Sequence, residues 1–202
     1  MTVPPAPLFG EVIASQASPH TLDFLARRRS ASAMALVAPG PTRSELNELL
    51  RLAARVPDHG KLNPWRVVIL EGEAKAAFVA RLEAIAAARP DAPKAMGAMG
   101  KLRIPPLAVA VISSPVEGAI PLWEQQLSAG AVCTTLLIAA TAMGYGANWI
   151  SDWYSFDAEA LALLGVRDRE QVAGFVYLGS FGQPPQERVR PELADIVSDW
   201  QP

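Results

Sequence analysis

The sequence predicts a mixed β-sheet with helices packed on it, and three observations lead to this prediction. Half of the 202 residues are apolar, which is enough to build a sizeable core. Three short apolar runs, at residues 65–70, 107–112 and 172–178, have the length and composition of strands. Segments with helical periodicity lie between these runs, so helices and strands alternate along what we expect to be a single domain, residues 1–202.

The N-terminal part is predicted to hold an arm and two helices. Residues 1–18 are rich in Pro, Ala and Ser and form the arm. A helix is expected from Thr21 to the basic cluster Arg27–Arg29, because cations near a helix C-terminus complement the helix dipole. The segment Thr-Arg-Ser-Glu at 42–45 has the spacing of a capping box, so it predicts a helix over 43–55.

Turn residues at 57–60 end that helix and introduce a strand at 65–70. A further helix is expected over 73–88, whereas residues 89–106 are expected to be irregular or a broken helix. The run at 107–112 is apolar without interruption, which is typical of a strand covered on both faces.

A long helix is expected from Trp123 to Met143, and it is apolar nearly all round from Ala129 onward. Such a helix is buried, and in a chain of this size a subunit interface can bury it. The remaining expectations are a short strand, a small helix, a buried strand and an extended C-terminal tail, at residues 147–150, 157–165, 172–178 and 183–202.

Composition excludes several classes of function. The net charge of -2 and a pI near 5.7 give no support to nucleic-acid binding. Cys133 is the only cysteine, so a disulfide framework and a thiolate metal site are not expected, which fits a reducing cytoplasm. No apolar run is long enough to cross a membrane, and the first twenty residues do not read as a signal peptide. Only 19% of residues are charged, which favours an oligomer.

Basic residues gather in two stretches beside turn-forming residues. One is Arg28-Arg29-Ser30, and the other runs from Arg55 through His59 to Trp65. Guanidinium groups and a hydroxyl match the oxygens of a phosphate, so these stretches indicate a bound anion. Simpler interpretations stay open: a solvated helix end for the arginines, a turn residue for His59, and core positions for Trp65 and Trp149.

The familiar motifs for nucleotide binding and hydrolysis are missing. The sequence has no Gly-x-Gly-x-x-Gly after a strand, no phosphate-binding Walker loop, no Gly-x-Ser-x-Gly and no His-x-x-x-His metal pair. With two histidines and one cysteine, the chain has few groups for hydrolysis or metal chemistry. If the protein is an enzyme, we expect a cofactor to carry the reaction.

With these motifs taken together, the chain resembles the nitroreductase family, and most closely its YdjA-like branch. The resemblance covers about residues 20–182, in order and at compatible spacing. It rests on Arg28-Arg29-Ser30, Arg55-x-Pro57-Asp58-His59, Pro64-Trp65, Glu71-Gly72-Glu73, Trp123-Glu124-Gln125-x-x-Ser128-Ala129-Gly130, Gly144-x-Gly146-x-x-Trp149 and the segment 172–179.

The resemblance implies an α+β fold, with a mixed, mostly antiparallel sheet flanked by helices, in an intertwined homodimer. It implies one FMN at each of two sites between the subunits. By this resemblance Arg28, Arg29 and Ser30 bind the phosphate and ribityl end. Arg55 and His59 come from one subunit, and Trp149, Ile150 and Ser151 line the flavin from the other. The further expected flavin contacts are Lys61 at the pyrimidine edge and Arg188 or Arg190 at the phosphate. Asn63 departs from the Gln that is common in the branch.

The implied activity is a ping-pong transfer of hydride from NAD(P)H through flavin N5 to a nitroaromatic or quinone-type acceptor. No catalytic side chain and no metal are expected, because the flavin carries the chemistry. Two alternatives stay open: a relative of the same fold with another task, such as dehalogenation or flavin cleavage, and a non-catalytic FMN-binding dimer.

Overall fold

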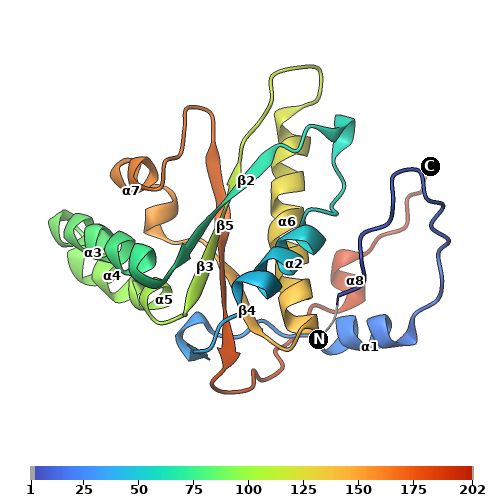
Figure 1. The fold of residues 1–202 in the computed structure, drawn as a ribbon, viewed down its shortest axis with the longest axis horizontal. Helices are drawn as coiled ribbons and strands as arrows, with labels where there is room; N and C mark the ends of the chain where they lie inside the picture. Colours follow the sequence, from blue (N-terminus) through green and yellow to red (C-terminus); the bar gives the residue numbers. More distant parts are fainter. Residues whose placement is uncertain (1–2, 202) are drawn as a thin grey trace.

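The computed structural model describes residues 3–201, and it places one five-stranded sheet between two groups of helices (Figure 1). β5 lies centrally, with β3 and then β2 on one side and β4 and β1 along the other. Every pairing among the described strands is antiparallel, in line with the mostly antiparallel sheet that the resemblance implies. The α+β class is confirmed. The strands are β1 (Leu36–Val37), β2 (Trp65–Glu71), β3 (Leu107–Ser113), β4 (Gly146–Ile150) and β5 (Gln171–Phe181).

The helices lie on both faces of this sheet (Figure 1). They are α1 (Pro19–Arg27), α2 (Arg43–Ala53), α3 (Gly72–Ala88), α4 (Ala92–Ala98), α5 (Gly100–Arg103), α6 (Leu122–Ala142), α7 (Ala158–Leu163) and α8 (Leu193–Ile196). Three short 3-10 turns, η1 (Ala33–Ala35), η2 (His59–Lys61) and η3 (Trp153–Ser155), complete the described elements.

The side-chain alternation of the central strands separates two cores. In β3, Ala108, Ala110 and Ile112 face the helices α3, α5 and the turn η3, whereas Leu107, Val109 and Val111 face α2 and α6. All seven residues of β3 are buried, as predicted for a strand covered on both faces.

Helix α2 is held at its start by the predicted capping box. The Thr42 hydroxyl accepts a hydrogen bond from the backbone N–H of Glu45 at 3.3 Å, and the Glu45 carboxylate accepts one from the backbone N–H of Thr42 at 2.9 Å. The Thr42 hydroxyl also donates a hydrogen bond to the Glu45 carboxylate at 2.7 Å, and this bond, followed by the one from the backbone N–H of Thr42, lowers the pKa of Glu45 to about 2. Leu46, Leu49 and Ala53 then face the sheet and are buried.

Helix α6 differs between its two ends. From Ala129 onward its inward face is buried, including Cys133, whose thiol pKa burial raises to about 12. Its first turns instead expose Leu122, Trp123 and Leu127, which are 52%, 68% and 52% accessible. These residues precede the stretch that the sequence predicts to be buried; from Ala129 to the end of α6, the exposed positions are Thr134 and Ala142.

Residues 89–106, expected to be irregular or broken helix, contain the short helices α4 and α5, as a broken helix requires. Two other segments differ from the sequence predictions. The tail at 183–202, expected to be extended, contains the single turn α8 among its described residues. β1 was not predicted, because its two residues become a strand only through pairing with the end of β5.

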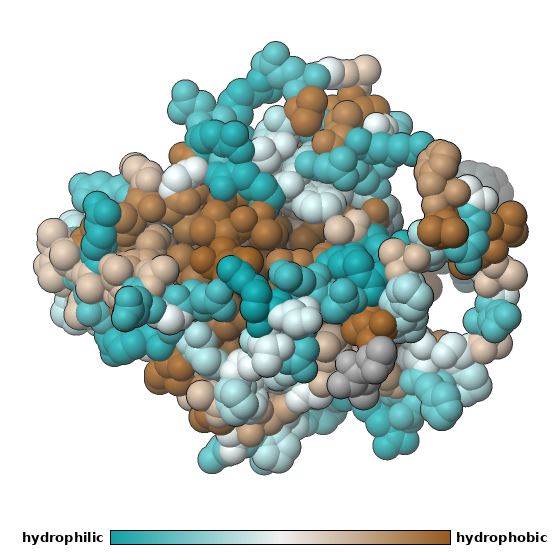
Figure 2. Space-filling model, viewed as in Figure 1, coloured by the Kyte–Doolittle hydropathy of each residue, from teal (hydrophilic) through white to brown (hydrophobic). Residues whose placement is uncertain are grey.

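The terminal segments stand away from the body (Figure 1). The arm carries Leu8, Phe9, Val12 and Ile13 at 62–109% exposure. The tail, from 183 to 201, exposes Val189, Leu193, Ile196, Val197 and Trp200. In Figure 2 these segments, on the right of the view, show apolar patches, and a broader apolar area lies across the body. Among residues 3–201, no helix has the length and apolar character to span a bilayer.

Candidate functional site

The first group of predicted site residues follows helix α1. The helix is capped by the Ser18 hydroxyl and ends when the backbone N–H of Arg28 donates to Phe24 O at 2.8 Å. The chain then turns to an extended conformation, and the N–H of Ala31 donates to Ala147 O at 2.9 Å. This contact fixes Arg28, Arg29 and Ser30 beside the start of β4.

These arginines form a cluster with an excess of positive charge. Nη2 of Arg28 donates to the Ser30 hydroxyl at 3.3 Å, and the pKa of Arg28 is lowered by burial, then by the nearby charges of Arg190 and Arg29. Among the ion pairs of the described residues, Glu187 is the one carboxylate that meets this cluster, at 3.6 Å from Arg29 and 3.1 Å from Arg190. Three guanidinium groups therefore share one counter-charge.

A phosphate fits this cluster on the chemistry of its donors. The buried Nε of Arg28 has no hydrogen-bond partner among the described residues, which is costly for a charged group. A bound dianion would offset the mutual repulsion of the arginines and accept their hydrogen bonds. Arg188 adds no side-chain contact here; its backbone N–H donates to the Glu187 carboxylate at 2.7 Å.

Strand β4 places the predicted flavin-lining residues beside this cluster. The Trp149 indole lies against Gly174 of β5, since a Cβ added at Gly174 would come within 2.0 Å of its Nε1. The indole N–H donates to Ala173 O at 3.3 Å, and the side chain is still 39% exposed. Ile150 packs against the core on the opposite face, and Ser151 is exposed. Trp149 is therefore an open platform and not a core residue.

Asn148 joins the same region, although the sequence gave no signal for it. Its side-chain N–H₂ donates to Ala31 O, while its buried Oδ1 has no partner among residues 3–201. A buried acceptor left unpaired beside Ser30 is a second polar atom that the fold does not satisfy internally.

The second group of predicted residues forms a tight loop after α2. The Asp58 carboxylate accepts hydrogen bonds from the backbone N–H groups of Leu62 and Asn63, at 3.1 and 2.7 Å. Lys61 and Asn63 both have positive φ, 56° and 48°, in the left-handed region that Asn tolerates well. The conformation of the loop is thus compatible with Asn63. The loop leaves the Lys61 side chain exposed.

His59 sits at the start of this loop and contacts helix α6. Its Nδ1 lies 2.6 Å from Oε2 of Glu124, in the first turn of the helix. The pair borders a groove of about 350 Å³ lined by Pro57, His59, Glu124, Leu127, Ser128 and Ala131. Arg55 lies four residues before His59, is exposed, and makes no ion pair among the described residues.

The two groups do not meet within one chain. His59 touches the first turn of α6, whereas Arg28 to Ser30 lie beside the strand that follows the end of α6. A 21-residue helix is about 30 Å long, so its length separates the two groups. Figure 1 shows the same separation between the turn after α2 and helix α1.

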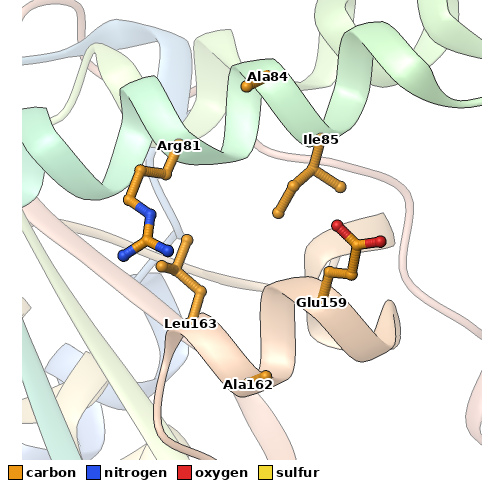
Figure 3. A pocket seen from close by; sticks show the side chains of 6 residues that line it. All are labelled: Arg81, Ala84, Ile85, Glu159, Ala162 and Leu163. Carbon is orange, nitrogen blue, oxygen red and sulfur yellow. The ribbon is translucent and has the colours of Figure 1, made fainter.

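Another groove lies on the opposite face of the sheet. It has a volume of about 510 Å³ and runs between α3 and α7, with Arg81 and Glu159 at its sides (Figure 3). Its other lining residues are Ala84, Ile85, Ala162 and Leu163. None of the predicted site residues borders this groove. Among residues 3–201, no group of three or more His, Cys, Asp or Glu side chains could hold a metal ion.

Comparison with known proteins identifies the family of the chain. The model of the nitroreductase family matches residues 25–180, which is most of the chain. The chain belongs to the nitroreductase family. The arm and the tail lie largely outside the matched residues.

Individual relatives support the same assignment. Over 161 residues the chain is 35% identical to "Putative NAD(P)H nitroreductase YdjA" of Escherichia coli, which covers 79% of this chain and 87% of that protein. A nitroreductase-like protein from Bacillus cereus has the same fold, with a TM-score of 0.79, 18% identity and coverage of 92% and 98%. A nitroreductase from Bacteroides fragilis with bound FMN aligns with a TM-score of 0.68, 20% identity and coverage of 91% and 100%.

Proposed function

We propose that this protein is an FMN-dependent oxidoreductase that uses NAD(P)H to reduce a nitroaromatic or quinone-type acceptor. The observation that carries the proposal is the cluster of Arg28, Arg29 and Arg190 around a single carboxylate, in a chain of this family. The bound FMN found in the Bacteroides fragilis relative supplies the identity of the phosphate-bearing ligand. When bound, FMN would accept hydride at N5 and return two electrons to the acceptor, in ping-pong order.

The chain's own residues bind and orient this cofactor. Arg28, Arg29 and Ser30 neutralise the phosphate, with Arg190 as a further cation. Trp149 and Ser151 would line the ring from the same chain, because β4 is fixed beside the cluster, whereas the side chain of Ile150 faces the core.

The polar side chains of the second group would take the other edge of the flavin. Arg55 and Lys61 would place donors near the ring atoms that gain negative charge on reduction, with the His59 ring beside them. The length of α6, about 30 Å, separates these residues from Arg28 of the same chain. A second copy of the chain would therefore contribute them to the site.

A homodimer accounts for both the split site and the exposed apolar surface. Leu122, Trp123 and Leu127 lie next to the groove of His59 and are more than half exposed. β2 lies at the end of the strand order, so its outer edge is open among the described strands. The arm and the tail add further apolar side chains (Figure 2). Association of two copies would cover these surfaces and complete two sites.

The purified protein tests this proposal directly. We expect a yellow preparation that loses its colour on anaerobic addition of NAD(P)H and regains it with a nitroaromatic or quinone. A colourless protein that FMN cannot reconstitute would contradict it. A yellow protein that NAD(P)H does not reduce would instead indicate a non-catalytic flavin-binding dimer.

A further inference from the structure

The first turns of α6 hold the neighbouring loops through three polar side chains. Gln125 bonds the backbone of the loop at 116–120: its Oε1 accepts from the N–H of Val116 at 2.8 Å, and its Nε2 donates to Val116 O and Ile120 O, each at 3.0 Å. Ser128 donates to Pro57 O at 2.8 Å and accepts from the indole N–H of Trp65 at 3.3 Å. Both ends of the loop that carries His59 are thus fixed to one helix.

Glu124 completes this set, but it bonds a side chain and not the backbone. Its Oε2 lies 2.6 Å from Nδ1 of His59. An ionised carboxylate can only accept, so the proton of this hydrogen bond belongs to Nδ1 of the ring. Nε2 of His59 then stays available, and it has no hydrogen-bond partner among residues 3–201.

The other carboxylate near His59 is engaged elsewhere. The Asp58 carboxylate accepts from two backbone N–H groups of the loop, so it is not free to orient the ring. Glu124 is therefore the group that decides which ring nitrogen carries the proton, because the tautomer of a histidine follows the bond made by its other nitrogen.

We propose that Glu124 is a positioning residue that holds His59 as the Nδ1–H tautomer and presents Nε2 as its one nitrogen open to a ligand. The effect on flavin binding rests on the proposed function. The tautomer is a property of the protein itself and is testable without any flavin.

Nitrogen NMR of the imidazole rings tests the tautomer. The sequence has two histidines, so His20→Asn leaves His59 as the only signal. At about pH 9, where an ordinary imidazole is neutral, we expect a protonated Nδ1 and an unprotonated Nε2. Glu124→Ala should shift the proton toward Nε2, whereas Glu124→Gln, which keeps an acceptor oxygen, should not.

A matched control is Glu73→Ala, because Glu73 is an exposed carboxylate in the first turn of α3 with no ion pair among the described residues. It should leave the ring signals of His59 unchanged. A wild-type ring protonated on Nε2, or a Glu124→Ala spectrum identical to wild type, would overturn the proposal.

A double-mutant cycle tests whether Glu124 acts through His59. We expect Glu124→Ala to weaken FMN binding on the order of three- to tenfold. In the His59→Ala background the same change should have no further effect, because the group it orients is gone. Additive losses would contradict the proposal. If wild type binds no FMN at all, the proposed function fails, while the NMR result still decides the role of Glu124.

Discussion

The Arg28 cluster and the His59 loop are two halves of a site that are built in different ways. The cluster is fixed by backbone contact with β4 and holds three guanidinium groups against one carboxylate. The loop is held by side chains of α6 and by Asp58, and it stays exposed. The first half is charged enough to bind an anion by itself. Arg55 and Lys61 of the second half are exposed and screened by solvent, so we expect them to contribute less to the affinity for an anion.

The largest effect on FMN binding is expected from removing an arginine of the Arg28 cluster. Arg28→Ala should weaken FMN binding by about 1.5–3 kcal/mol, because it removes a charge-assisted bond to the phosphate. Fluorescence titration with FMN measures this. Arg27→Ala is the matched control, since Arg27 is the preceding residue but pairs with Asp23 in the exposed turn of α1. Equal losses in the two variants would remove the cluster from the site.

The next largest effect is expected from displacing the Trp149 side chain beside the Arg28 cluster. Gly174→Ala places a methyl group where the Trp149 indole lies, so the ring must move, at a cost of about 1–3 kcal/mol in the free energy of unfolding. FMN affinity should fall as well. Urea unfolding with FMN titration measures both. Gly97→Ala, in a helix with open space around the site of the new Cβ, should not destabilise the protein.

A substitution far from both halves of the site should lower the stability of the fold without changing the affinity for FMN. Thr42→Ala removes half of the capping box of α2 and should cost about 1 kcal/mol of stability. FMN affinity at neutral pH should stay unchanged, because Thr42 touches neither half. A loss of FMN affinity comparable to that of Arg28→Ala would show that the halves are not as separate as the contacts indicate.

The same capping box predicts a pH dependence. Because the folded state lowers the pKa of Glu45 from 4.5 to about 2, its contribution is present above pH 4.5 and is lost as the pH falls toward 2. Wild-type stability should therefore fall more steeply than that of Thr42→Ala over this range. Parallel curves in acid unfolding would contradict this.

The smallest effect on FMN binding is expected from the arginines of the tail, and it shows which of them belongs to the Arg28 cluster. Arg190→Ala should weaken FMN binding about two- to fivefold, because Arg190 is an exposed, screened member of the cluster. Arg188→Ala should leave binding unchanged, since its side chain does not join the ion pairs of the described residues. The reverse order, measured by the same titration, would assign the tail contact to Arg188.

Local signals predicted the elements that depend on local physics. The capping box located α2, and the uninterrupted apolar run located β3. β1 carries no such signal, because it forms only through pairing with the distant end of β5. In the site, too, local patterns are readable from the sequence and long-range contacts are not. Arg28 to Ser30 stand out in the sequence, whereas the role of Glu124 depends on a contact with a residue 65 positions away.

The central claim is that one site takes Arg28 from one chain and His59 from another, and heterodimers test it. Arg28→Ala chains are combined with His59→Ala chains, and heterodimers are isolated by two affinity tags. One of the two sites then carries both changes and the other carries neither. We predict one FMN bound with wild-type affinity per heterodimer, although both parent homodimers bind weakly. Heterodimers without a wild-type site would contradict the account, because each site would then draw both residues from the same chain.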